Sequence, residues 1–274
     1  MARIRVRIAR VPSVLALSLS TALVLTVTAC GSDKADSADT STSGKKSGDA
    51  PVVVATTTWE GAFAKAAGAE DVKVIVPSSA QHAPDYDPKP SDLTAIAGAD
   101  FVLYAPFEPY AEKIKEAAGS DAKLVEVNLD NDADKASAEV TRLGKLFGTE
   151  DAAAKWDTSF KSEYGTLRKE LKGAWPDGKA PAVVAQVFSV WSAKMAGAEV
   201  SGTYGPEAVT AKQLSDLVKK KPAYVFDNVH MTTGKVLPDS GAKQVEIVNY
   251  PGKDLDLLTV YKNAADTIRK SMAS

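Results

Sequence analysis

The chain has 274 residues, with 33 basic and 35 acidic side chains and a formal net charge of −2. Proteins that bind nucleic acid show a basic stripe or an excess of basic residues, and this charge balance disfavours that class. Because the chain has one cysteine, it cannot form an internal disulfide, and its fold must depend on an apolar core.

Residues 1–29 have the pattern of a secretory signal peptide. Four arginines within residues 1–10 precede an apolar stretch that ends in small residues at Ala29. Pro12 and several serines and threonines interrupt this stretch. A membrane-spanning helix needs about 20 mostly apolar residues and is therefore the weaker interpretation. Residues Val27–Cys30 resemble the bacterial lipobox, in which the cysteine sulfur is lipidated and the cysteine becomes the new N-terminus.

Lipidation of Cys30 predicts a protein anchored to the extracytoplasmic face of a bacterial cell membrane. The alternative is a chance cysteine near a signal cleavage site. A second acyl chain, such as palmitate, is important because each buried CH₂ group contributes ~0.8 kcal/mol and one chain anchors only marginally. Cleavage before Cys30 removes four arginines and leaves 29 basic against 35 acidic residues. Residues 30–50 are predicted to form a flexible tether, because after the cysteine this segment has almost no large apolar side chain.

Residues 51–132 are predicted to form an N-terminal α/β lobe. Short β-branched or aromatic runs indicate strands, and amphipathic runs between them indicate helices. One helix is delimited by Pro90 and Ser91 at its start and Gly98 at its end. Short buried strands separated by helices favour a parallel sheet with right-handed crossovers. The predicted strands are Val52–Thr56, Val72–Val76, Asp100–Tyr104 and Leu124–Val127, and the predicted helices are Trp59–Ala67, Ser91–Gly98 and Glu108–Ala118.

Residues 133–174 are predicted to be a helical segment that links two lobes. Large apolar side chains between Trp156 and Leu171 recur at spacings of four, four, three and four residues, which is the period of a helix face. Gly148–Glu150 is predicted to break or bend the segment. The helix from Glu150 to Lys172 would be ~35 Å long at 1.5 Å per residue. This length suits a helix along a two-lobed body, and an ordinary long surface helix is the alternative.

Residues 175–274 are predicted to form a C-terminal α/β lobe. It begins at the turn Trp175–Gly178, after which strands and helices alternate again. The predicted fold class is therefore α/β, with two lobes that each contain a mainly parallel sheet flanked by helices, joined by one long helix. The predicted strands are Ala182–Phe188, Ala223–Asp227 and Gln244–Asn249, and the predicted helices are Trp191–Ala196, Thr210–Lys220 and Asp256–Met272.

The segment Val74–Asp100 carries the most specific motif of the chain. A histidine, His82, precedes Tyr86–Pro88, Pro90 and Ser91–Asp92, and a short apolar strand follows. This order resembles the first metal-binding loop of the substrate-binding lipoproteins of zinc/manganese-type ABC importers. Weaker matches to the same family follow in the expected order at Val183–Gly197, Ala223–His230 and Val245–Gly252.

The resemblance implies a membrane-anchored solute-binding component that delivers a divalent metal ion, Zn²⁺ or Mn²⁺, to an ABC permease and its ATPase. It implies a monomer, and it implies a binding protein that has no catalytic cofactor. The alternative is a binding or adhesion module of the same fold with a degenerate metal site, or one for a small organic ligand. An enzyme is disfavoured because the chain has no Gly-x-Ser-x-Gly, His-Glu-x-x-His or P-loop pattern.

A zinc site of this family has three histidines and a carboxylate, and the manganese site has a second carboxylate in place of one histidine. The chain has only two histidines, so one molecule cannot supply three. His82 lies four residues before Tyr86, and Pro84 occupies the position that matches the family's first histidine. A shift of the loop would bring His82 into the site, or Asp85 would replace it. Alternatively, His82 is a solvated loop residue.

Of the family's other ligand positions, the second falls within residues 129–134, and the third and fourth fall on amides. Gln186 (or its neighbour Ala185) and Asn249 match ligand positions, and Asn228 matches a glutamate that lines the cleft. Amides coordinate hard cations, but they do not neutralise a divalent charge. His230 is at a strand-to-helix junction, where α/β proteins place ligand-binding groups, or else is a surface histidine. The acids within 130–134 are interpreted as solvated helix-start residues, and the alternative is that one of them enters the site.

Trp59, Tyr86 and Trp191 are predicted as possible lining of the cleft. Trp59 follows the first predicted strand, and Trp191 follows the first strand of the second lobe. Aromatic and amide groups together would suit a small organic ligand better than a bare ion. The alternative is that these side chains pack the lobes.

Overall fold

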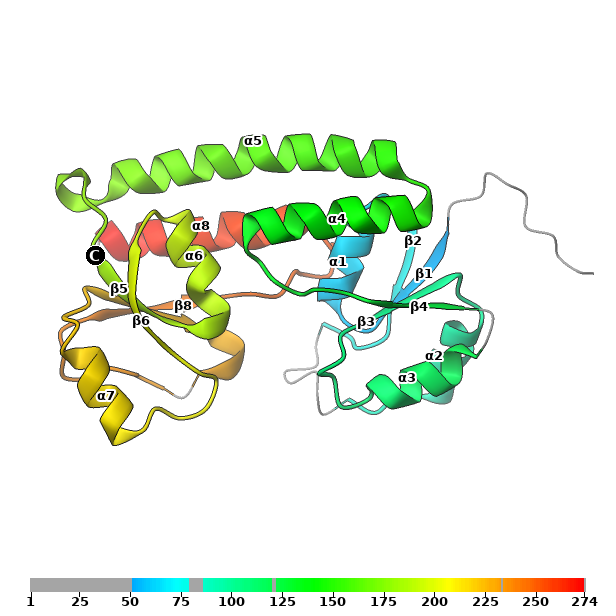
Figure 1. Ribbon diagram of the computed structural model, residues 1–274, viewed down its shortest axis with the longest axis horizontal. Coiled ribbons are helices and arrows are strands. Elements are labelled where there is room, and N and C mark those ends of the chain that lie inside the picture. Colours follow the sequence, from blue (N-terminus) through cyan, green and yellow to red (C-terminus); the bar gives the residue numbers. More distant parts are fainter. Residues whose placement is uncertain (1–50, 79–85, 120–121, 233, 274) are drawn as a thin grey trace, which may run out of the picture. The chain divides into compact units, whose positions relative to one another are not determined.

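Two four-stranded parallel sheets form the framework of the computed structural model, which describes residues 51–78, 86–119, 122–232 and 234–273 (Figure 1). The strand order is β2-β1-β3-β4 in the first sheet and β6-β5-β7-β8 in the second. The first sheet contains β1 (Val52–Ala55), β2 (Asp71–Val74), β3 (Phe101–Tyr104) and β4 (Lys123–Glu126), and the second contains β5 (Ala182–Gln186), β6 (Glu199–Tyr204), β7 (Tyr224–Asn228) and β8 (Lys243–Ile247).

The first sheet is buried by helices on both of its faces. Side chains of a strand alternate between the two faces. Val53 therefore packs in the same core as Phe63 of α1 (Thr58–Ala66), whereas Val54 packs with Ile96 of α2 (Pro90–Ala97) and Ile114 of α3 (Ala111–Ala118). We call this sheet with α1, α2 and α3 the N-terminal lobe. The predicted start of α3 at Glu108 is wrong by three residues, because Glu108 lies in the preceding loop and its carboxylate accepts hydrogen bonds there.

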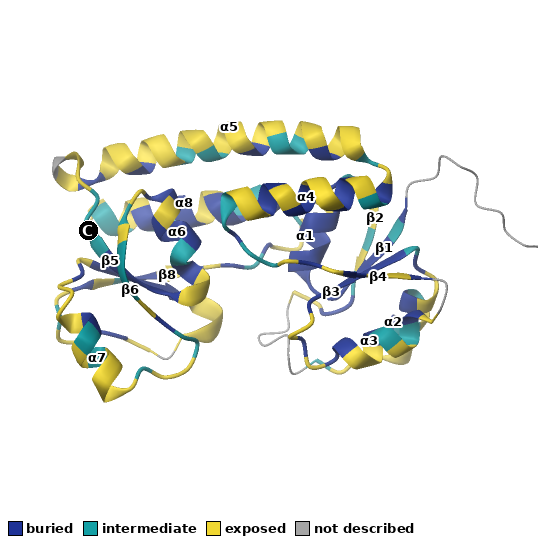
Figure 2. Ribbon diagram, viewed as in Figure 1, coloured by how far each residue is buried: buried dark blue, intermediate teal, exposed yellow. Residues whose placement is uncertain are grey.

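The linking segment consists of two helices, α4 (Ala133–Phe147) and α5 (Glu150–Ala174), which lie side by side (Figure 1). Gly148 has the left-handed φ of +73° that commonly ends a helix. The predicted break at 148–150 is therefore confirmed. Along α5, Phe160 and Leu171 face inward, and Figure 2 shows a largely exposed outer face.

The second sheet with α6 (Val190–Met195), α7 (Ala211–Val218) and α8 (Leu257–Ala273) forms the C-terminal lobe. Strand β6 was missing from the sequence-based prediction, although its residues alternate between polar and apolar, because glycine, which is rare in strands, occupies one of its three apolar positions. Its Gly202 is tightly packed, since a Cβ atom there would lie 2.9 Å from Leu217 Cδ2. The predicted strand Ala182–Phe188 is too long, because residues Val187–Ser189 form a 3₁₀ turn instead.

One apolar core extends from the N-terminal lobe into the C-terminal lobe. It includes Phe101 of β3, Phe160 of α5, Phe226 of β7 and the fully buried Tyr261 of α8. The Phe160 and Tyr261 rings meet edge to face, with their centroids 5.0 Å apart. The predicted fold class, two α/β lobes linked by a long helix, is confirmed. Within the described ranges, no helix is both long and apolar enough to span a membrane.

Candidate functional site

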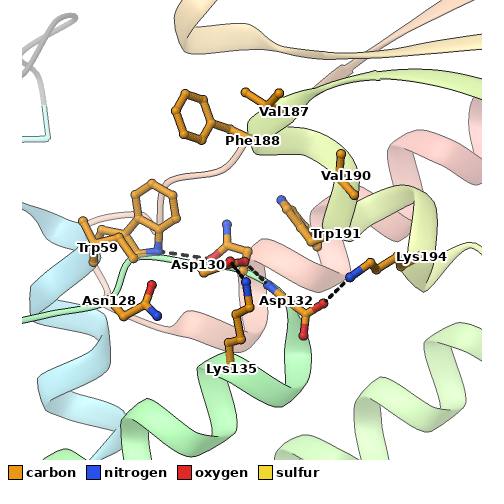
Figure 3. A pocket seen from close by; sticks show the side chains of 12 residues that line it. Trp59, Asn128, Asp130, Asp132, Lys135, Val187, Phe188, Val190, Trp191 and Lys194 are labelled. Atoms are coloured by element: carbon orange, nitrogen blue, oxygen red, sulfur yellow. Dashed lines mark hydrogen bonds and ion pairs between the residues drawn. The ribbon is translucent and has the colours of Figure 1, made fainter. Parts of the chain in front are cut away.

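A pocket of 430 Å³ lies where residues that follow β4 meet residues that follow β5 (Figure 3). The carboxyl ends of parallel strands are the usual position of ligands in open α/β sheets. Trp59 projects into this region from α1, and Phe188 and Trp191 project from the opposite side (Figure 3). The lining residues are Trp59, Asn128, Leu129, Asp130, Asn131, Asp132, Lys135, Val187, Phe188, Val190, Trp191 and Lys194.

Two asparagines and two tryptophans form a buried hydrogen-bond network behind the pocket. The Trp59 indole Nε1 donates to Asn131 Oδ1 at 3.1 Å, and Asn131 Nδ2 donates to the backbone oxygen of Asn249 at 3.0 Å. The Trp191 Nε1 donates to Asn249 Oδ1 at 2.9 Å. Asn249 Nδ2 donates to the backbone oxygen of Phe188 at 3.1 Å. The network connects both lobes and holds both indoles in place.

Three residues predicted as metal ligands have protein partners in this structure. Asn249 is fully buried, and each atom of its side-chain amide group is hydrogen-bonded as described above. Gln186 Oε1 accepts from the backbone N–H of Phe188 at 2.8 Å, and Asn228 Oδ1 accepts from the backbone N–H of His230 at 3.1 Å. These two amides therefore stabilise the 3₁₀ turns that follow β5 and β7. Gln186 Nε2 is buried and has no hydrogen-bond partner among the described atoms.

His230 lies at the surface of the C-terminal lobe, and its ring meets the Tyr250 ring edge to face with centroids 4.8 Å apart. Partial burial lowers the pKa of His230 below its usual value. Among the described residues, no group of three or more histidine, cysteine or acidic side chains is arranged to hold a metal ion. Cys30, His82 and Asp85 lie outside the described residues.

The predicted cleft-lining aromatics occupy two different regions. Trp59 and Trp191 line the pocket and are both nearly buried. Tyr86 lies elsewhere, where its hydroxyl donates to Asp92 Oδ2 at 2.8 Å at the start of α2.

Charged side chains that the sequence analysis did not select surround the pocket. Lys135 forms an ion pair with Asp130 at 2.6 Å, and Lys194 forms one with Asp132 at 2.8 Å. Hydrogen bonding to Lys194 lowers the pKa of Asp132 below its usual value. Asp132 also caps α4 through the backbone N–H of Asp134, as its position at a helix start predicted. One sequence signal was available for Lys194, because it lies three residues after Trp191 and such pairs share a helix face.

A second polar feature is a pair of buried carboxyl groups, Glu60 and Glu108, near the ends of β1 and β3. Glu108 accepts hydrogen bonds from Thr56 Oγ1, Tyr110 Oη and the backbone N–H of Ala105, each at 3.1 Å. Burial, and then the charge of Glu60, raises the pKa of Glu108 to about 8. Burial likewise raises the pKa of Glu60. Glu108 is therefore predominantly protonated at neutral pH in the folded protein.

Comparison with known proteins identifies the family that the N-terminal part of the chain resembles. Residues 53–152 match the family model described as zinc-uptake complex component A, periplasmic (ZnuA). The sequence resemblance to a metal-uptake family is thereby confirmed. This match includes the N-terminal lobe, all of α4 and the start of α5. Comparison with curated proteins finds no match.

Solved structures with the same fold include three metal-related proteins. A laminin-binding protein of Streptococcus agalactiae, described as having adhesin and metal-transporting activity, is 18% identical, with 81% of this chain and 99% of that chain covered and a TM-score of 0.59. FpvC of Pseudomonas aeruginosa, in complex with Mn²⁺, is 15% identical, with coverages of 82% and 99% and a TM-score of 0.62. A ZnuA structure is 18% identical, with coverages of 81% and 99% and a TM-score of 0.57. The prediction of a binding protein and not an enzyme agrees with these comparisons.

Proposed function

We propose that this chain is the extracytoplasmic solute-binding component of an ABC importer. The match of residues 53–152 to a zinc-uptake component carries this proposal, and the two-lobed fold supports it. In this proposal, lipidated Cys30 anchors the chain to the cell membrane. The folded body then works as a monomer on the tether 30–50 and delivers its solute to a permease driven by an ATPase.

A divalent metal ion, Zn²⁺ or Mn²⁺, is the cargo that the family match supports. Such an ion requires neutral imidazole and anionic oxygen at about 2.0–2.2 Å. In the described residues, the amides at Gln186, Asn228 and Asn249 are already bonded to protein groups. A metal site therefore depends on the remaining predicted ligands, His82, Asp85 and His230.

Metal binding by the mature lipid-free protein tests this cargo. The protein is stripped with chelator and titrated with Zn²⁺ and Mn²⁺ by calorimetry, and its metal content as isolated is measured separately. We expect one ion per chain and a large loss of affinity in His82→Ala, and His230→Ala tests whether the second predicted imidazole also binds the ion. Absence of binding below about 100 μM, which corresponds to only ~5.5 kcal/mol, would exclude metal as cargo.

A small organic solute is the second candidate cargo, and the character of the pocket favours it. The pocket presents two indoles, exposed apolar side chains and paired charges, all of which lie among the described residues. Concave sites with an apolar wall and a few fixed polar groups are typical of organic ligands. This candidate keeps the importer function and changes only the solute.

A further inference from the structure

We infer that the pocket in Figure 3 binds a small zwitterion with an apolar body, of which a free amino acid with a branched or aromatic side chain is the simplest example. The inference rests on the proposed solute-binding function and names the chemical class of the solute. It depends on the charges of the pocket, on its apolar surface and on the network behind it.

The charges at the pocket are balanced. Asp130 and Asp132 contribute two carboxylates, and Lys135 and Lys194 contribute two ammonium groups, joined in pairs at 2.6 and 2.8 Å (Figure 3). A bare divalent cation that approached either carboxylate would meet a neighbouring ammonium group and would be repelled. A solute that carries one positive and one negative group finds a partner for each. The charge pattern therefore selects a zwitterion over a metal ion.

Both ion pairs are accessible enough to exchange partners with a solute. The side chains of Lys135 and Lys194 are 58% and 59% exposed, and those of their partners Asp130 and Asp132 are 35% and 20% exposed. Ion pairs of this kind stabilise a protein by only about 0–1 kcal/mol, so opening one is not costly. The carboxylate of a zwitterion can then bind Lys194 while its ammonium group binds Asp132. This exchange keeps every charge paired.

The apolar part of the pocket provides the second half of the recognition. Val187 and Phe188 are 42% and 47% exposed, although large apolar side chains are usually buried. They lie opposite Trp59 across the pocket (Figure 3). An apolar solute side chain placed there would remove the exposed surfaces of Val187 and Phe188 from water and would lie against Trp59, which is already nearly buried. The volume of 430 Å³ lies within the range of about 300–1,000 Å³ that is usual for small organic ligands.

The network behind the pocket fixes the two indole rings before a solute arrives. Trp59 is bonded to Asn131, and Trp191 is bonded to Asn249. A rigid wall reduces the ordering that binding requires and so favours affinity for a small solute. Amides at these positions therefore act as positioning residues for the aromatic wall.

Titration of the mature protein with L-phenylalanine and L-leucine, by calorimetry and by tryptophan fluorescence, tests the inference. N-acetyl-L-phenylalanine lacks the ammonium group, and L-phenylalanine amide lacks the carboxylate. We expect saturable binding of the free amino acids and binding at least about tenfold weaker for each blocked form, because each loses a charged hydrogen bond. Lys194→Gln should weaken binding of the free amino acid by a similar factor, and Asp132→Asn should do the same.

Lys212→Gln is the matched control, because Lys212 forms an equally short, exposed ion pair with Asp216 on α7, and α7 does not line the pocket. It should bind like the wild type. The inference is overturned if neither amino acid binds up to ~10 mM, an affinity below ~3 kcal/mol. It is also overturned if the blocked forms bind equally well or if Lys194→Gln behaves like the control. Binding of Zn²⁺ or Mn²⁺ without amino-acid binding overturns the inference and leaves the importer function standing.

Discussion

Replacing Glu108 with glutamine tests whether the buried carboxyl pair is protonated in the folded protein. Burial and the neighbouring Glu60 raise the pKa of Glu108 from 4.5 to about 8. In the unfolded chain the same group titrates near ~4.3. Between these two values the folded protein holds a proton that the unfolded chain has released. The free energy of unfolding therefore falls as the pH rises through this window.

The size of the effect follows from the two pKa values of Glu108. Each pH unit inside the window lowers the free energy of unfolding by up to about 1.4 kcal/mol, so a rise from about pH 5 to about pH 8 removes roughly 3–4 kcal/mol. Glutamine does not titrate, so the variant should lack this loss and keep only the contribution of Glu60, whose pKa burial also raises. At about pH 5 it should be the less stable protein, by ~1 kcal/mol, because one oxygen that accepts from Thr56 or from the backbone of Ala105 is replaced by an amide nitrogen. At about pH 8 the order should reverse.

Urea unfolding followed by circular dichroism at several pH values measures this crossover. The matched control is Glu112→Gln on the exposed face of α3, which should keep the pH dependence of the wild type. Burial lowers the pKa of His230, so below its usual pKa the titration of this residue raises the free energy of unfolding as the pH rises. This contribution is the same in all three proteins. If Glu108→Gln loses as much stability as the wild type between about pH 5 and pH 8, the carboxyl group is ionised in the folded state and the reasoning is refuted.

Two further substitutions probe the packing of the linking helices and the network. Gly144→Ala should lower the free energy of unfolding by about 1–3 kcal/mol, because its Cβ would lie 2.5 Å from Ala153 Cβ between α4 and α5. In contrast, Gly165 has open space around it, so Gly165→Ala should be neutral or stabilising by up to about 1 kcal/mol. If the Gly144→Ala and Gly165→Ala proteins lose the same stability in thermal denaturation, this prediction is wrong. Asn249→Leu should lower the free energy of unfolding, measured with urea, by about 2–4 kcal/mol, because the buried Trp191 N–H loses its acceptor. Asn263 is exposed, and a loss no larger than that of Asn263→Leu would show that the network does not stabilise the fold.

The parts of the fold that depend on local periodicity could be predicted from the sequence. Along α5, the four-residue spacing of Trp156 and Phe160 predicts neighbours on one helix face, and their rings stack with centroids 4.7 Å apart. Strand β6 could not be predicted in this way. It is an edge strand in which only Tyr204 is buried, and Gly202 interrupts its apolar positions.

The candidate site was less predictable, because its contacts join distant parts of the chain. Resemblance to the metal-uptake family predicts Asn249 as a ligand, but the hydrogen-bond partner of Asn249, Trp191, lies 58 residues earlier in the sequence. No local pattern shows that this amide is fully occupied by protein groups. For Glu60 a signal was available, since Thr57 and Glu60 have the Thr-x-x-Glu spacing of a helix capping box and form one. Its burial beside Glu108 depends on the tertiary fold.

The core shared by the two lobes limits how far the lobes can move apart, and so how the proposed solute would be released. Phe160 and Tyr261 lie in one apolar cluster with residues of both sheets, so a wide hinge motion would expose that cluster to water. We therefore expect small-angle scattering profiles with and without solute to superimpose, and a clear change in radius of gyration would contradict this. A carrier that stays rigid cannot signal its occupancy by closing. Under the proposed importer function, the permease would have to sense the solute directly at the exposed rim formed by Val187 and Phe188.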